Sequence, residues 1–182
     1  MSNFPIDEKN LAKFGPYTMI IGILLILLGA AGILLPGAMS VGTAIFVTWM
    51  LIVGGVFWAV HTFKYTPKSV MDWLKPVLLL ISGGLMLFSP ESGVAAVGLM
   101  LAIYLLLHGF ASFANAQSLH PAKGWGWMVF NGITSVLLAI LFLIGWPVTS
   151  LWLVGLYVGI TLLFDGWALL AIGWALDKRK KA

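Results

Sequence analysis

Residues 14–63 read FGPYTMIIGILLILLGAAGILLPGAMSVGTAIFVTWMLIVGGVFWAVHTF and contain no Asp, Glu, Lys or Arg. One membrane-spanning helix needs about 20 consecutive apolar residues, so this stretch is too long for a single crossing. Pro36-Gly37 lies near its middle, and this dipeptide is a strong turn signal. The stretch therefore predicts two membrane-spanning helices, roughly 16–35 and 40–63.

The same pattern occurs twice more along the chain. Residues 72–88 and 92–114 are separated by Ser89-Pro90, and residues 125–145 and 149–176 are separated by Trp146-Pro147. Runs of this length, rich in Leu, Ala and Gly, favour helices over the shorter alternating strands of membrane barrels. The sequence thus predicts an all-α membrane protein with six transmembrane helices, forming one integral membrane domain over residues 1–182.

Composition supports this class and excludes others. Apolar residues make up 61% of the chain and charged residues 9%, with a mean hydropathy of +1.05, whereas an average soluble domain is about 45–50% apolar and 25% charged. A soluble globule of this size could not hide so much apolar surface. The chain has no Cys, which excludes disulfides, Cys-based zinc sites and thiol nucleophiles.

The three turn prolines, Pro36, Pro90 and Pro147, mark an internal repeat. They recur at nearly equal intervals, and a glycine follows nineteen residues after each one. We expect three helical hairpins in parallel orientation, at approximately 14–63, 72–114 and 125–176, followed by a basic tail at 177–182. Seven residues before the proline the first two hairpins carry Gly29 and Gly83, but the third carries Ile140.

Small residues also form a stripe on the last predicted helix. Such residues let membrane helices approach closely, and a spacing of four or seven residues keeps them on one helical face. We expect this face to meet another helix, although glycine is also generally frequent in membrane helices. The predicted helix-packing glycines are Gly155, Gly159, Gly166 and Gly173.

The basic residues indicate the orientation in the membrane. All ten Lys and Arg lie before the first span, around the loops near 64–75 and 115–124, or in the tail, and the proline turns contain none. The positive-inside rule therefore predicts that both termini are cytoplasmic and that the proline turns face the periplasm of a bacterial inner membrane. We expect the tail to contact anionic lipid headgroups.

Two ionisable side chains, His108 and Asp165, lie inside predicted spans, each eighteen residues after its turn proline. A titratable group inside a bilayer is costly unless it is paired or hydrated, so each is a functional candidate. A proton-responsive pair, a structural hydrogen-bonded pair and two separate interfacial side chains all fit this spacing. The candidate intramembrane polar cluster comprises His61, Tyr104, His108, Asn115, Thr161 and Asp165.

No catalytic, cofactor or metal site is recognisable. His61, His108 and His120 lack metal-ligand spacing, and there is no glycine-rich phosphate loop or nucleophile elbow. We therefore expect a protein that is not an enzyme, that uses no cofactor and that does not bind nucleic acid.

With its hairpins, its outer-turn prolines, the Pro90-Glu91 pair and the glycine nineteen residues after each proline, the chain resembles the HdeD family of bacterial inner-membrane proteins. This resemblance implies a non-catalytic role in resistance to acid and related stress. The protein would act by helix packing, as a homo-oligomer, or through a membrane-protein partner. The alternative is a small proton-responsive transporter or channel that uses His108 and Asp165.

Overall fold

The computed structural model describes residues 15–181, and side chains as far as Asp177. Within these residues it contains six helices and no strand: α2 (Gly15–Leu34), α3 (Pro36–Tyr65), α4 (Val70–Phe88), α5 (Pro90–Leu119), α6 (Trp125–Leu143) and α7 (Ser150–Lys181). Each helix is long and apolar enough to cross a membrane, which confirms the predicted all-α class and the six spans. Lys9, Lys13 and the side chains of the basic tail after Asp177 lie outside the described residues.

The turns that contain the prolines are tighter than expected. Only Leu35 separates α2 from α3, and only Ser89 separates α4 from α5. The sequence predicts that α3 and α5 begin at Ser40 and Ser92, whereas the structure begins them at Pro36 and Pro90. The reason is that proline is well suited to the first helical position, where its missing N–H needs no partner.

The third proline turn is longer. Residues 144–149 connect α6 to α7, and Gly145 adopts a left-handed backbone conformation with φ of 80°. A side chain at this position would be strained, so glycine is required by the turn itself. The three outer connections are therefore not equivalent, although the prolines recur.

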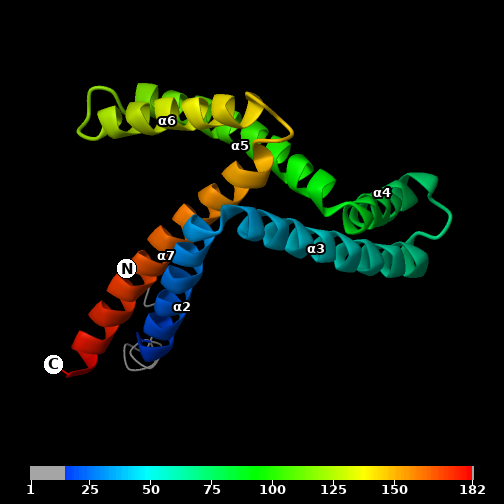
Figure 1. Cartoon of the computed structure of the whole chain (residues 1–182), viewed down its shortest axis with the longest axis horizontal. Helices are drawn as coiled ribbons and strands as arrows, with labels where there is room; N and C mark the ends of the chain where they lie inside the picture. Colours follow the sequence, from blue (N-terminus) through cyan, green and yellow to red (C-terminus); the bar gives the residue numbers. More distant parts are fainter. Residues whose placement is uncertain (1–14, 182) are drawn as a thin grey trace, which may run out of the picture. The chain divides into compact units, whose positions relative to one another are not determined.

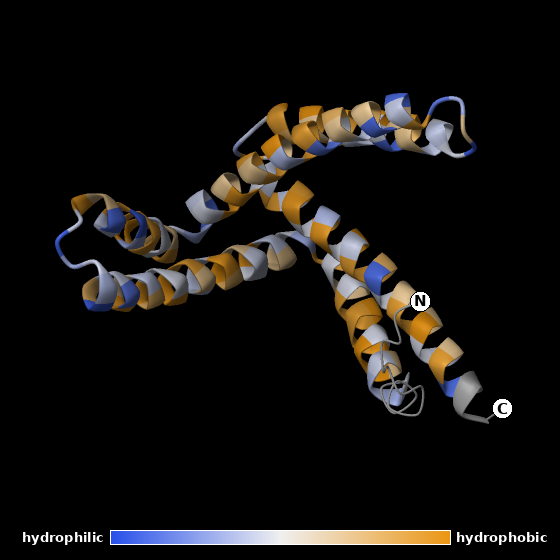
Figure 2. Ribbon diagram, turned by 180° about the vertical axis from the view of Figure 1, so that it is seen from behind, coloured by the Kyte–Doolittle hydropathy of each residue, from blue (hydrophilic) through white to orange (hydrophobic). Residues whose placement is uncertain are grey.

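At the opposite ends the helices extend beyond the predicted spans. The helices α3 and α5 each contain 30 residues, which is about 45 Å and longer than the hydrocarbon core of about 30 Å. Short polar loops follow at 66–69 and 120–124. Figure 2 shows apolar residues along the helices and hydrophilic residues gathered at these loops.

The described residues form two compact units, one from the part of the chain up to residue 39 with the part from residue 155 onward, and one from residues 40–154. In the first unit α2 and α7 run antiparallel, side by side (Figure 1). In the second unit α3 pairs with α4, and α5 pairs with α6, each pair closed by a polar loop. The second helix of each predicted hairpin thus packs on the first helix of the next hairpin, giving the pairs α3·α4 and α5·α6. The last helix, α7, packs on the first, α2.

Candidate functional site

The buried faces of α3, α5 and α7 are built from small residues at the same four positions of each repeat. Counted from the turn proline, these positions coincide with those of the α7 glycine stripe. In every case the residue is Gly, Ala or Thr, and in every case it is buried. The residues are Ala44, Thr48, Gly55 and Thr62 on α3; Gly98, Ala102, Gly109 and Ala116 on α5; and Gly155, Gly159, Gly166 and Gly173 on α7.

In the α2·α7 pair, glycine faces glycine. A Cβ atom added to Gly166 would lie 2.7 Å from the carbonyl oxygen of Gly22, and one added to Gly22 would lie 2.8 Å from the carbonyl oxygen of Gly166. Likewise, a Cβ on Gly159 would lie 2.9 Å from the carbonyl carbon of Gly32. The backbones of the two helices are therefore in direct contact, and no larger residue fits between them.

The other two predicted packing glycines of α7 also face this unit. Gly173 lies against the backbone of Gly15 and the side chain of Met19, and Gly155 lies against the backbone of Pro36. The structure therefore brings all four glycines of the stripe to one interface.

The first helices of the repeats carry matching small residues. Gly29 and Gly83 are buried, and the third repeat buries Ala139, whereas the neighbouring Ile140 is 43% exposed. The third repeat departs from the pattern at Ile140 because the connection before Pro147 contains one additional residue. A small residue is thus present in all three repeats, eight residues before the proline in the third.

A polar cluster lies between α5 and α6. The Asn131 Nδ2 atom donates to Ser112 Oγ at 3.3 Å and lies 3.1 Å from His108 Nε2. The imidazole of the half-buried His108 also stacks on the ring of Tyr104, with 5.9 Å between centroids. Because an amide N–H can only donate, His108 Nε2 acts as the acceptor in this arrangement.

Sequence reasoning identified Tyr104 and His108 but missed Asn131 and Ser112. An amide side chain inside an apolar span is itself a signal, since it requires a partner in lipid. Asn131 is far from His108 along the chain, and only the pairing of α5 with α6 brings them together. Two polar side chains on neighbouring helices could not be matched before that pairing was known.

The other members of the predicted cluster have separate surroundings. His61 contacts Trp58 and Tyr65 on its own helix, with ring centroids 5.5 Å and 4.8 Å apart. Asn115 is exposed near the end of α5, and Thr161 Oγ1 donates to the carbonyl of Tyr157 at 2.9 Å. Asp165 is exposed, on the part of α7 that belongs to the other unit, so its pairing with His108 stays a prediction.

A second contact in the α3·α4 pair occupies the same repeat position as the Asn131 cluster. The Lys75 Nζ atom lies 3.4 Å from the centroid of the Trp58 ring. Trp58 and Ser112 lie the same number of residues after their turn prolines. Each contacts a polar side chain of the opposing helix, Lys75 on α4 for Trp58 and Asn131 on α6 for Ser112. A cation–π contact in one pair thus replaces a hydrogen bond in the next.

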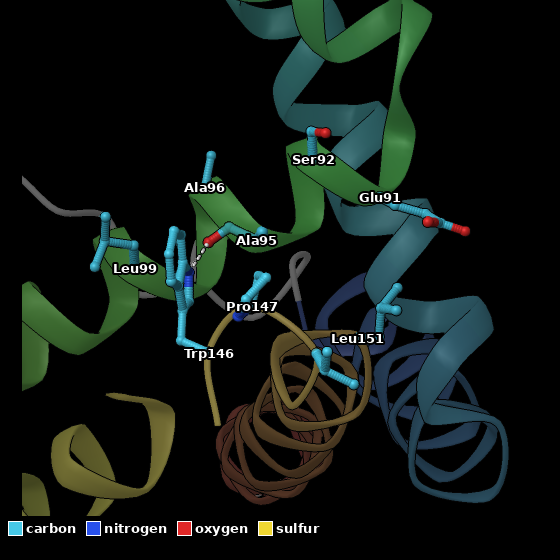
Figure 3. Close-up of a pocket in the computed structure, with 9 residues that line it drawn as sticks. Glu91, Ser92, Ala95, Ala96, Leu99, Trp146, Pro147 and Leu151 are labelled. Atoms are coloured by element: carbon cyan, nitrogen blue, oxygen red, sulfur yellow. Dashed lines mark hydrogen bonds between the residues drawn. The ribbon is translucent and has the colours of Figure 1, made fainter. Parts of the chain in front are cut away.

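A groove of about 510 Å³ opens beside the long third turn. One wall is α5, and the other is the segment that leads into α7; the Trp146 Nε1 atom donates to the carbonyl oxygen of Ala95 at 3.0 Å and fixes the indole against α5 (Figure 3). The groove is lined by Glu91, Ser92, Ala95, Ala96, Leu99, Trp146, Pro147, Val148 and Leu151. Among the described residues there is no group of three His, Asp or Glu side chains placed to hold a metal ion.

The comparison with protein families gives two overlapping matches to one model, described as a short repeat of unknown function (DUF308), over residues 20–88 and 74–144. The second copy begins one repeat after the first and is slightly longer, which agrees with its longer polar loop at 120–124. No curated protein and no solved structure matches this chain. Because the two copies together span more than half of its residues, the chain belongs to the DUF308 family of short repeats.

Proposed function

We propose that this DUF308 membrane protein is a non-catalytic stress protein that acts by helix packing or through a membrane partner. The observation that carries the proposal is the composition of the buried helix faces. Each repeat devotes the same four buried positions to Gly, Ala or Thr, residues that bring helices together and supply no reactive group. The resemblance to the HdeD family supports resistance to acid as the stress involved.

The proposal places the protein in a bacterial inner membrane with both termini in the cytoplasm. The described polar loops carry Lys64, Lys68 and Lys123, whereas the only ionisable residue of the outer turns is Glu91. This distribution follows the positive-inside rule. The basic tail would then contact anionic lipid headgroups, and the helix surfaces would allow a homo-oligomer or a membrane-protein partner.

A second candidate function is a small proton-responsive transporter or channel that uses His108 and Asp165. The contact between His108 and Asn131 favours it, because protonation of the imidazole would convert the Nε2 acceptor into a donor facing the amide N–H groups. That contact would break or the amide would rotate, which gives the α5·α6 pair a response to acid.

Proton flux in proteoliposomes separates the two functions. Under an imposed acid gradient, the packing role predicts the same flux as in protein-free liposomes. Flux above that level, lost in His108→Asn, would overturn the packing role in favour of transport. A parallel acid-survival assay in a strain that lacks the gene tests the stress role, which predicts lower survival that the unmodified gene restores.

A further inference from the structure

We propose that the groove beside Trp146 binds a phospholipid with a protonated primary amine in its headgroup, drawn from the leaflet next to the proline turns. The groove combines one carboxylate at its mouth with an apolar interior. It lies at the end of α5 that begins with Pro90, where the 30-residue helix is longer than the hydrocarbon core. This position lets a lipid place its headgroup at the mouth and its acyl chain in the groove.

The groove has a polar end and an apolar end. Glu91 and Ser92 lie on the first turn of α5, and Leu99 lies eight residues further along, about 12 Å away along the helix axis. Figure 3 shows Glu91 and Leu99 at opposite ends, with the Trp146 indole beside Leu99. Such a gradient matches an amphiphile that lies along the helix.

The small residues of α5 leave the space for a chain. The α5 side of the lining includes Ala95 and Ala96, and Trp146 and Leu151 come from the segment that leads into α7. The hydrogen bond from the Trp146 indole to the carbonyl of Ala95 holds this wall in place. An apolar groove of this kind is suited to an acyl chain, which is flexible and has no polar group to satisfy.

The charge at the mouth selects the headgroup. Glu91 is the only ionisable residue among the nine that line the groove, and it is exposed. Its carboxylate attracts an ammonium group, and a primary ammonium also donates hydrogen bonds that a trimethylated one cannot. An anionic headgroup would instead be repelled.

The groove also departs from the repeat. In the first repeat the position of Glu91 is occupied by Gly37, and the turn that corresponds to residues 144–149 is Ser89 alone. The wall that contains Trp146 therefore belongs to the longer third turn, which has no counterpart of equal length in the other two repeats.

Quenching of Trp146 fluorescence by brominated lipids tests the proposal. The full chain is reconstituted in phosphatidylcholine bilayers that contain a minor fraction of acyl-brominated phosphatidylethanolamine, phosphatidylcholine or phosphatidylglycerol. The signal of Trp146 is the difference between the unmodified protein and Trp146→Phe, since the chain has nine Trp. We expect quenching by the ethanolamine lipid to correspond to roughly threefold enrichment over the choline lipid, the order expected for one exposed ion pair.

Two variants, each with a control variant, separate binding of the headgroup from binding of the acyl chain. Glu91→Gln should abolish the enrichment, and Asp72→Asn, which removes a carboxylate outside the groove, should keep it. Ala96→Phe, which fills the groove, should lower quenching by every lipid, whereas Ile103→Phe on an exposed part of α5 should not. Equal quenching by all three lipids, or enrichment that persists in Glu91→Gln, would overturn the proposal.

Discussion

The α2·α7 and α5·α6 pairs use the same repeat positions but pack in different ways. In α2·α7 the glycines face each other, and Gly166 meets the backbone of Gly22. In α5·α6 a Cβ on Gly109 would meet the Val136 side chain first, at 2.7 Å, and the carbonyl oxygen of Gly132 at 3.1 Å, while Gly132 faces the Phe113 ring. A small residue at a fixed repeat position thus permits close approach of two helices. The residue on the opposing helix decides whether backbone or side-chain atoms make the nearest contact.

The difference extends to polar groups. In α5·α6 an amide on one helix reaches a hydroxyl and an imidazole on the other. In the α3·α4 pair the same repeat position holds Lys75 over Trp58. The repeat therefore provides a common frame of small residues, and each pair adds its own side-chain contact to that frame.

The largest expected effect comes from filling the contact between glycines. Gly166→Leu should lower the free energy of unfolding by about 3 kcal/mol or more, because its Cβ would meet backbone atoms that cannot move aside. Gly84→Leu is the matched control, since a Cβ there has no neighbour within 4 Å. Thermal unfolding in detergent measures both. Equal melting temperatures for the two variants would show that α2 and α7 do not pack in this way.

The third repeat offers a test at neighbouring positions. Ala139→Ile should destabilise by about 1–3 kcal/mol, because Ala139 is fully buried and the larger side chain overfills its site. Ile140→Ala should have a smaller effect, since Ile140 is 43% exposed. Denaturant or thermal unfolding compares the two. The opposite order would show that Ala139 is not the repeat equivalent of Gly29 and Gly83.

A smaller effect is expected from the polar cluster. A double-mutant cycle with His108→Ala and Asn131→Ala should give a coupling energy of about 0.6 kcal/mol, typical of hydrogen bonds between membrane helices. Unfolding of the single and double variants measures this energy. A coupling indistinguishable from zero would mean that Asn131 does not stabilise the α5·α6 pair through His108.

The pairing predicted between His108 and Asp165 is tested in the same way. If the two side chains are partners, His108→Asn and Asp165→Asn together should be less destabilising than the sum of the single changes, because neither leaves an unpaired ionisable group. Coupling in acid survival as well as in stability would support a proton-responsive role. Strict additivity of the single changes, in stability and in acid survival, would show that His108 and Asp165 do not interact.

The sequence was sufficient for the six helices and for the repeat. Helices follow from apolar length, and the recurrence of Pro36, Pro90 and Pro147 required only spacing. It was also sufficient to select the glycine stripe of α7, because a small residue every four or seven positions lies on one helical face and permits close packing there.

The pairing of helices could not be predicted in this way. The prolines suggest hairpins closed at the outer turns, whereas the antiparallel pairs close at the polar loops or join the first helix to the last. Each apolar helix could pack on either of two neighbouring helices. The shape complementarity of the two surfaces decides between them, and the sequence pattern does not contain this information. Asn131 was missed for the same reason. In the third repeat, the additional residue before Pro147 places the buried small residue, Ala139, eight residues before the proline instead of seven, where Ile140 lies.

The order of helix pairing is the central claim, and a disulfide across α2·α7 tests it most directly. A Cβ on Gly15 would lie 3.5 Å from the Leu176 Cβ, within the range for a disulfide, and the chain has no Cys of its own. Gly15→Cys with Leu176→Cys should form a bond on mild oxidation, so that cleavage at Lys64 or Lys68 leaves both fragments joined until reduction. The control pair, Leu34→Cys with Leu176→Cys, places the cysteines at opposite ends of the α2·α7 pair. No disulfide should form there, so cleavage should separate the two fragments. Release of the fragments from the Gly15 and Leu176 pair, at the level of the control, would contradict the account.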